Sequence, residues 1–379
     1  MAEPPSKRTK ADAENSAVWL YDKDDLRVEP YSTMVTNPLG PHEVRVQVGA
    51  VGICGSDVHY LKHMRIADFV VREPMVIGHE SAGVVSEVGS EVTGLEVGDR
   101  VAMEPGVPCR RCDHCKSGVY NLCPDMRFFA TPPVHGSLAE VVVHPADFCF
   151  KLPTGMTLEQ GALCEPVAVA VHACRRAGVK PGDCVAVLGA GPIGLLTVMV
   201  AKAFGATSTA VTDVSDKRLE MALRPEVGAD VTVNVSRLSA EDAAKQLQTN
   251  LGRRPDTCVD CCGMGATVTT ALAVAKNGGR VCVVGMGSDN MELPLTTAMA
   301  REVDLVGVFR YRNAYPMAVQ LISTRAIDVS PLITDRVSLV GGFDLPKIKE
   351  AFETSAKGEK SIKVMFNLLD EQGVAGRGA

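Results

Sequence analysis

The pattern of hydrophobic and polar positions divides the chain into two parts, and the change falls near Thr157. Before this point apolar and polar residues alternate in short runs such as residues 44–48, and glycines punctuate the runs at residues 83–89 and 98–102. A period of two places successive side chains on opposite faces of a strand. Short strands at this spacing predict a mainly β, barrel-like domain.

After Thr157, apolar runs without alternation take turns with helical segments. Residues 184–188 contain no charged position, as expected for a strand that is buried on both faces. Strands that alternate with helices predict a doubly wound parallel sheet, so the fold class is α/β with a second, mainly β domain. We predict six strands at residues 184–188, 209–212, 231–235, 257–261, 280–284 and 305–309.

Beyond Arg312 the alternation of strand and helix stops. We expect a strand at residues 337–340, a helix at 345–354 and a strand at 360–366, which return to complete the first domain. The predicted organisation is listed by residue numbers: a disordered tail at 1–16, a mainly β domain at 17–165 and 312–379, and a doubly wound domain at 166–311.

Composition and charge exclude several classes of protein. Hydrophobic residues make up 46% and charged residues 22% of the 379 residues, which is ordinary for a globular chain of about two domains. The net charge of −6 indicates no nucleic-acid-binding surface. Glycines and Lys202 interrupt the apolar residues 185–204, which therefore predict a strand, a turn and a buried helix and not a membrane span.

The cysteine count indicates reduced thiols. Thirteen is an odd number, and a chain of this length does not need disulfides to hold its fold. The first 14 residues are polar and charged, which differs from the pattern of a secretory signal peptide. We therefore expect a cytoplasmic protein whose clustered cysteines bind metal.

A glycine-rich motif predicts a dinucleotide site. Gly189-Ala190-Gly191-Pro192-Ile193-Gly194 follows a buried strand and begins an apolar helix. The first glycine would allow the tight turn, the second the approach of a pyrophosphate, and the third close packing of helix on strand. The free N–H groups of the helix N-terminus would face the phosphates.

Asp213 ends the next predicted strand, 19 residues after Gly194. A carboxylate at this place accepts hydrogen bonds from the ribose hydroxyls of NAD and repels the 2′-phosphate of NADP. Asp213 therefore favours NAD, whereas the nearby Arg218 would partly offset its charge. The alternative for Asp213 is a simple turn or helix-capping residue.

Four cysteines form the most specific local pattern. Cys109, Cys112, Cys115 and Cys123 have the short spacings of a closed tetrahedral zinc site, and the residues between them are too polar to form a core. Four thiolates leave no position for a substrate, so the predicted zinc ion is structural. The alternative is four unligated thiols in a loop.

A second metal site is indicated by Cys54 and His79, each on a glycine-flanked turn. Three protein ligands with one exchangeable position are typical of a catalytic zinc ion. The spacing alone does not establish this site, because a single Cys or His at a strand end is more often packed than ligated.

At these residues the sequence resembles the zinc-containing medium-chain dehydrogenase superfamily. The stretch G-H-E-x-x-G-x-V at residues 78–85, the turn at 54–57, the four-cysteine segment and the glycine motif occur in that family's order. The resemblance covers about residues 17–367 and implies a GroES-like catalytic domain with a Rossmann domain. Within the superfamily, the sorbitol dehydrogenases resemble the chain at residues 54–60, 120–122, 128–133, 164–166 and 308–313, and the intact cysteine segment resembles their plant-type and microbial branches.

The resemblance implies roles for individual residues. Cys54, His79 and Glu80 would hold the catalytic zinc ion, with Glu165 beside it as a ligand or as the partner of a water molecule. Ser56 and His59 match a proton relay of alcohol dehydrogenases. The positions that match the substrate pocket are Tyr60, Phe128, Thr131, Glu165, Arg310 and Tyr311. The positions that match the nicotinamide site are Val284, Gly285, Met286, Gly287, Val308, Phe309 and Arg310.

The predicted function is zinc-dependent oxidation of a polyol at C2 to a ketose, with hydride transfer to NAD and two zinc ions per chain. Glu80 in place of a second thiolate makes the metal site harder, and Glu165 with Arg310 makes the pocket more polar than a simple alcohol requires. The alternatives within the family are dehydrogenases of L-idonate, xylitol, L-arabinitol or threonine. A non-enzymatic structural protein on this fold is disfavoured by the complete set of metal-site residues. The family further implies a homo-oligomer, with a tetramer favoured.

Overall fold

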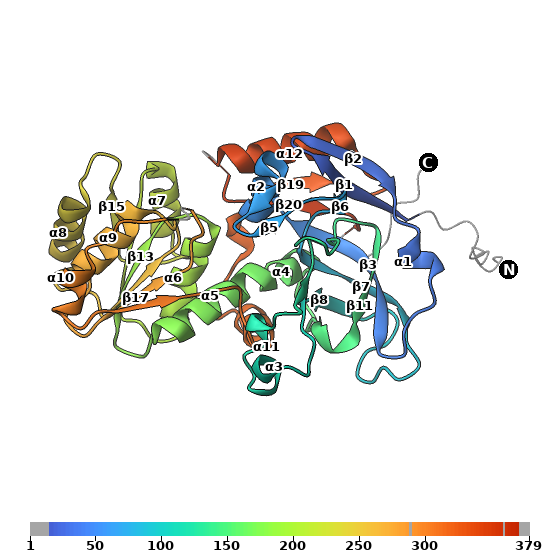
Figure 1. Cartoon of the computed structure of the whole chain (residues 1–379), viewed down its shortest axis with the longest axis horizontal. Coiled ribbons are helices and arrows are strands. Elements are labelled where there is room, and N and C mark those ends of the chain that lie inside the picture. Colours follow the sequence, from blue (N-terminus) through green and yellow to red (C-terminus); the bar gives the residue numbers. More distant parts are fainter. Residues whose placement is uncertain (1–14, 288–289, 359–360, 371–379) are drawn as a thin grey trace.

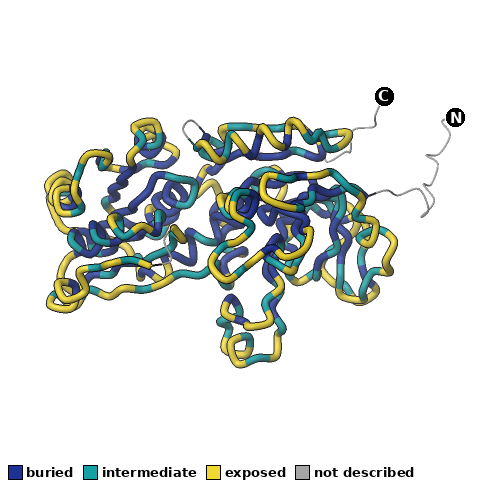
Figure 2. Tube along the Cα trace, turned by 45° about the horizontal axis from the view of Figure 1, so that its top comes forward, coloured by how far each residue is buried: buried dark blue, intermediate teal, exposed yellow. Residues whose placement is uncertain are grey.

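The computed structural model describes residues 15–287, 290–358 and 361–370. Its two main sheets occupy separate halves of the molecule, and α5 (Cys164–Ala177) runs between them (Figure 1). Buried residues fill the interior of each half, whereas exposed residues lie on the outer helices and loops (Figure 2). No helix within the described ranges combines the length and apolarity that a membrane crossing requires.

The first half is mainly β, as predicted. Its largest sheet has the order β12-β8-β7-β3-β20-β19, and β11 also pairs with β3. The strands of this sheet are β3 (Glu43–Gly52), β7 (Glu80–Val88), β8 (Arg100–Met103), β11 (Val141–Pro145), β12 (Cys149–Lys151), β19 (Ile333–Ser338) and β20 (Lys363–Asn367). Smaller sheets are formed by β1 (Ser16–Asp22), β2 (Asp25–Pro30) and β6 (Met75–Val76), by β4 (Arg65–Ile66) and β5 (Phe69–Val70), and by β9 (Gly106–Val107) and β10 (Arg127–Phe128).

Short helices connect and cover these sheets. They are α1 (Thr33–Thr36), α2 (Gly55–His63), α3 (Asp113–Lys116), α4 (Leu158–Ala162), α11 (Tyr315–Ser323) and α12 (Leu345–Lys357), with the 3₁₀ turns η1 (Tyr120–Leu122), η2 (Ala146–Phe148) and η3 (Ser330–Leu332).

The C-terminal segment returns to the first half. Strand β20 pairs antiparallel with β3, with Met365 opposite Gly52, and β19 pairs parallel with β20. The prediction of a strand at 337–340 was wrong in position, since β19 begins at Ile333. Its polar residues 334–336 are tolerated because exposed and half-buried positions alternate along this edge strand.

The second half contains a six-stranded parallel sheet in the order β15-β14-β13-β16-β17-β18, which is that of a Rossmann fold. Its strands are β13 (Cys184–Leu188), β14 (Ser208–Asp213), β15 (Val231–Asn234), β16 (Thr257–Asp260), β17 (Arg280–Val283) and β18 (Asp304–Gly307). Four of them end one or two residues before the predicted limit, because the chain turns out of the sheet at its carboxyl edge.

Helices cover both faces of this sheet. Core residues of α5, α6 (Pro192–Ala203) and α7 (Asp216–Leu223) pack on one face. Those of α8 (Ala240–Leu251), α9 (Gly265–Val274) and α10 (Leu295–Met299) pack on the other. This arrangement leaves the carboxyl ends of the strands facing the first half, where a crevice for ligands is expected.

Candidate active site

A cavity of about 370 Å³ lies between the two halves. The first half contributes residues of α2, β7 and the β10 loop, and the second contributes the glycine motif and the ends of β17 and β18. A separate cavity of about 460 Å³ is lined by residues such as Tyr31, Arg127 and His135, and none of the candidate residues lines it. The predicted catalytic metal ligands, Glu165 and Arg310 line the smaller cavity.

The register of the large sheet assembles the three candidate metal ligands. Gly52 of β3 lies opposite Glu80 of β7, so the turn after β3 carries Cys54 to His79 and Glu80. One ligand atom of each lies within 4.8 Å of the others. Thiolate, imidazole and carboxylate are all donors that zinc accepts, and three protein ligands leave a fourth position free. The donor set therefore fits a catalytic zinc ion.

Asp57 orients the histidine of this cluster. Its Oδ1 lies 3.3 Å from His79 Nδ1, and its carboxylate accepts hydrogen bonds from the backbone N–H groups of Cys54 and Gly78 at 3.0 and 3.2 Å. A carboxylate on one ring nitrogen fixes the tautomer and leaves the other nitrogen to a metal. Asp57 is buried, so this orientation is rigid.

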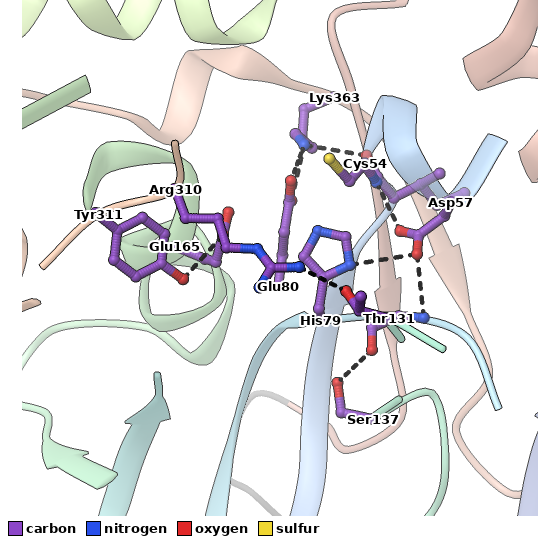
Figure 3. Close-up of polar contacts among 12 residues, drawn as sticks. Cys54, Asp57, His79, Glu80, Thr131, Ser137, Glu165, Arg310, Tyr311 and Lys363 are labelled. Carbon is purple, nitrogen blue, oxygen red and sulfur yellow. Dashed lines mark hydrogen bonds and ion pairs between the residues drawn. The ribbon is translucent and has the colours of Figure 1, made fainter. Parts of the chain in front are cut away.

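Lys363 of β20 neutralises Glu80. Its Nζ lies 2.7 Å from both carboxylate oxygens and donates to the Ile53 carbonyl at 3.0 Å (Figure 3). Both side chains are at most 3% exposed, so each charge depends on the other. Sequence analysis did not identify Lys363, although it stands next to the apolar Val364 in a predicted strand.

Glu165 lies at the start of α5 and lines the same cavity. Its Oε1 accepts a hydrogen bond of 2.9 Å from the Tyr311 hydroxyl. Burial raises the pKa of Glu165 to about 7, and the nearby Glu80 carboxylate acts in the same direction. A carboxyl with such a pKa is suited to exchange protons near neutral pH.

Arg310 approaches from the other half. Its Nη2 donates to Thr131 Oγ1 at 2.8 Å (Figure 3). Its guanidinium carbon lies 3.7 Å from the centre of the Phe128 ring. Tyr60 lines the cavity nearby. Sequence analysis missed some apolar residues that line the cavity, among them Phe69. The Phe69 ring stacks on that of Phe309, with centroids 6.4 Å apart.

The predicted proton relay is divided between cavity and surface. Ser56 lines the cavity, whereas His59 is exposed, does not line it, and has its ring 5.3 Å from that of His63. Both residues lie on α2, one turn apart. Their function as a relay stays a prediction.

The glycine motif has the geometry of a dinucleotide loop. Gly189 has a φ of +102°, a conformation that residues with a Cβ rarely adopt. A Cβ at Gly194 would collide with the Gly189 carbonyl oxygen, whereas a Cβ at Gly191 would meet nothing within 4 Å. Residues 191–194 line the cavity at the start of α6, so the loop fits a pyrophosphate.

Asp213 lies behind this loop at the end of β14. Its Oδ2 accepts from the Ala190 N–H at 2.7 Å and its Oδ1 from the Ser215 N–H at 2.9 Å. Arg218 Nη1 lies 3.9 Å from Asp213, and Nη2 donates to the Gly358 carbonyl at 2.9 Å. The carboxylate is therefore held in a fixed position, with the cation at its side.

Most of the residues predicted for the nicotinamide site line the cavity. Val284, Gly285, Met286, Val308, Phe309 and Arg310 line it. Gly287 is the predicted nicotinamide residue that does not line it. Of the residues predicted for the rest of the dinucleotide and for the substrate, Gly189, Asp213, Arg218 and Tyr311 do not line it either, although Tyr311 contacts Glu165.

The four cysteines converge as predicted from their spacing. Their sulfur atoms lie within 4.8 Å of one another, and none of the thirteen cysteines forms a disulfide. Backbone N–H groups point at the sulfurs, with Cys109 N 3.3 Å from Cys123 Sγ and Cys112 N 3.4 Å from Cys109 Sγ. Such hydrogen bonds from the backbone, led by that of Arg111, lower the pKa of Cys109 to about 6. Four thiolates in this arrangement fit a structural zinc ion.

Comparisons with known proteins agree with this geometry. Residues 40–154 match the alcohol dehydrogenase GroES-like domain, and residues 192–324 match the zinc-binding dehydrogenase domain. The chain is 54% identical to a sorbitol dehydrogenase of Arabidopsis thaliana, over 95% of this chain and 97% of that protein. It is 50% identical to an L-idonate 5-dehydrogenase of Vitis vinifera, over 94% and 95% of the two chains.

A solved structure shows the same fold. The L-idonate 5-dehydrogenase of Escherichia coli superposes with a TM-score of 0.82 at 29% identity, over 94% of this chain and 98% of that one. Together these likenesses show that the chain belongs to the zinc-binding medium-chain dehydrogenases, in their sorbitol dehydrogenase branch.

Proposed function

We propose that this protein is an oxidoreductase that converts a polyol such as sorbitol to a ketose at C2 and reduces NAD. One observation carries the proposal: a single cavity is lined by the three metal ligands, Glu165, Arg310 and residues 191–194 of the glycine motif. The names of the two plant relatives support a polyhydroxylated substrate.

A metal ion and a dinucleotide would supply the chemistry that amino acids lack. A zinc ion held by Cys54, His79 and Glu80 would supply Lewis acidity to the reacting hydroxyl, which lowers its pKa. NAD on the loop at residues 189–194 would supply the hydride acceptor. A second zinc ion in the four-cysteine cluster would be structural.

The chain's own residues bind the substrate and handle the proton. Glu165 is the candidate to accept the hydroxyl proton, and the Tyr311 hydroxyl holds its carboxylate in position. Thr131 and Arg310 present polar groups to neighbouring hydroxyls, while Phe69 and Phe309 exclude water. Ser56 with His59 provides an alternative route for the proton.

An aldonate such as L-idonate is the second candidate substrate. Arg310 forms no ion pair within 4 Å among the residues that the structure describes, so its charge is available to a carboxylate. Steady-state kinetics on sorbitol, xylitol, L-arabinitol, L-idonate and threonine distinguishes the candidates. A preference for L-idonate that is lost in Arg310→Gln would favour the aldonate.

NAD is the proposed cofactor because Asp213, at the end of β14, is the carboxylate expected to accept hydrogen bonds from the ribose hydroxyls and to repel a 2′-phosphate. The test compares NAD with NADP in the wild type and in Asp213→Ala. A wild-type preference for NADP contradicts the assignment. Zinc analysis of the same preparation should give two ions per chain. One ion per chain without activity would instead favour a non-enzymatic structural protein on this fold.

We also infer the organisation of the chain. The pairing of β20 with β3 supports a catalytic domain at residues 17–165 and 312–379 and an NAD-binding domain at 166–311. The edge strand β18 exposes Leu305, which supports pairing with a second copy and a homotetramer, to be tested by light scattering. The thirteen free cysteines support the reducing cytoplasm.

A further inference from the structure

We propose that the four-cysteine segment at residues 109–123, here called the lobe, holds the cavity loop at residues 308–313 in its substrate-binding conformation. The metal state of the lobe would thereby control polyol binding. The inference rests on the proposed function for its substrate, but its structural part concerns only contacts within the chain.

Two hydrogen bonds join the lobe to the two ends of the cavity loop. Asn121 Nδ2 donates to the Phe309 carbonyl at 2.9 Å, and the backbone N–H of Asn313 donates to the Tyr120 hydroxyl at 2.7 Å. A third and longer contact of 3.4 Å runs from Asn313 Nδ2 to the Gly118 carbonyl. The residues between these anchors include Arg310, which lines the cavity.

The cavity loop needs such anchors because its backbone is strained. Arg310 has a φ of +52° and Asn313 a φ of +48°, which lie in the left-handed region that side chains with a Cβ seldom occupy. Strained conformations persist only where surrounding contacts hold them. On the opposite side the loop is held by Arg175, whose Nη1 donates to the Asn313 carbonyl at 2.8 Å.

The anchoring side chains are themselves fixed within the lobe. Asn121 is buried, with 5% of its surface exposed. The Tyr120 hydroxyl donates to Glu104 Oε1 at 2.7 Å while it accepts from Asn313, so its direction is defined. These two residues form η1, which directly precedes Cys123.

The metal is what gives the lobe its shape. Between Cys109 and Cys123 no side chain except those of Asn121 and Cys123 is buried, so no apolar core holds this segment. The hydrogen bond from Tyr120 to Glu104, outside the lobe, holds one end of η1, and Cys123, drawn to the other three sulfurs, holds the other. Loss of the ion would release the Cys123 end of η1 and thereby loosen the anchors of the cavity loop.

The first test removes one anchor. In Asn121→Ala we expect the KM for the polyol to rise about three- to tenfold, as for the loss of one hydrogen bond. Limited trypsin digestion supplies a readout independent of activity. Cleavage after Arg310 and Arg312 should become several-fold faster, as measured by mass spectrometry.

The matched control is Asn15→Ala. Asn15 is also buried and also donates to main-chain carbonyls, those of Tyr31 and Val141, which belong to neither the lobe nor the cavity loop. We expect this variant to lower the melting temperature without changing the polyol KM or the cleavage after Arg310. A rise of KM in both variants would overturn the proposal.

The second test removes the metal of the lobe. Cys112→Ser should lose one of the two zinc ions and reproduce the higher polyol KM and the faster cleavage of the loop. Adding Asn121→Ala to it should have little further effect, because both changes act through one contact. The proposal is overturned if both variants only lower the melting temperature while the loop stays protected from trypsin. If the wild type oxidises no polyol but the cleavage pattern changes as expected, the proposed function fails and the anchoring stands.

Discussion

The two ligand clusters of this chain differ in how the sequence builds them. The four cysteines of the lobe lie within 15 residues, on a segment that is mostly half-buried or exposed. The triad of Cys54, His79 and Glu80 is assembled by two strands and completed by Lys363 from a third. The first cluster is therefore formed by a single short segment, whose shape it holds. The second cluster is formed by segments far apart in the sequence, and the buried side chains of Asp57 and Lys363 set its orientation and charge.

The largest effect that separates the clusters is expected from Cys54→Ala. We predict a loss of kcat/KM of about a thousandfold or more, because the Lewis acid is lost or displaced. One zinc ion per chain should disappear while the melting temperature changes little. Cys112→Ser is the control, with its expected changes in KM and loop cleavage. Equal losses of kcat in the two variants would contradict the division between a catalytic and a structural cluster.

Removing the buried partner of the triad tests its dependence on the fold. Lys363→Met leaves the Glu80 carboxylate buried without a counter-ion, so the free energy of unfolding should fall by about 3–5 kcal/mol. Urea denaturation of the metal-free protein measures it. Lys151→Met is the control, because the Lys151 side chain is 54% exposed in its ion pair with Asp99 and should contribute less than about 1 kcal/mol. A similarly small fall in the free energy of unfolding in both variants would show that the buried Glu80 carboxylate does not need Lys363 as its counter-ion.

Asp57→Asn sharpens the comparison at the level of metal affinity. The amide keeps the shape but loses the charge that holds His79, so zinc affinity of the triad should fall about 10- to 100-fold. Competition with a chelator, followed by zinc analysis, measures this affinity. Among the described residues no carboxylate is hydrogen-bonded to a cysteine side chain of the lobe, so zinc bound there should be released at the same chelator concentration in variant and wild type. If zinc release from both sites is the same in the variant and the wild type, Asp57 does not contribute to metal binding.

The smallest effect concerns Glu104, which contacts the lobe through Tyr120. Burial raises the pKa of Glu104 from 4.5 to about 7, so the folded chain keeps a proton that the unfolded chain loses. Stability from this group is present below pH 4.5 and is lost as the pH rises to about 7. Glu104→Gln should therefore be more stable than the wild type at pH 8 by on the order of 1–3 kcal/mol, and equal to it near pH 4.

Thermal unfolding at several pH values checks this prediction. His144, whose pKa is lowered by burial to about 4, titrates in both proteins and cancels in the difference. A constant difference between variant and wild type across the pH range would contradict the assignment to Glu104.

The sequence predicted local features well and non-local ones poorly. The cysteine cluster, the glycine motif and the six parallel strands each depend on neighbours in the chain. The structure confirms the six parallel strands and brings the four sulfurs together. The pairing of Lys363 with Glu80 depends on the register of β20 against β3, which no periodicity reveals. The role of Asp57 was missed although it stands three residues after Cys54. That spacing is typical of a residue that caps the start of a helix, and α2 begins there.

The residues of the cavity show the same division. Family motifs placed Glu165, Arg310 and Thr131 in one cavity, where the structure brings them together. They did not indicate the contact between Asn121 and the Phe309 carbonyl, because it joins a side chain to a backbone atom 188 residues away. Contacts of this kind carry no signature of residue type at the accepting end.

The pairing of Glu80 with Lys363 also sets an order of events during synthesis. The two residues are 283 positions apart, so Glu80 has no counter-ion until almost the entire chain has left the ribosome. All four cysteines of the lobe are available once residue 123 has emerged. Because domains form from the N-terminus as they are made, the lobe is able to take its zinc ion early. The catalytic triad reaches its final charge balance only once residue 363 has emerged.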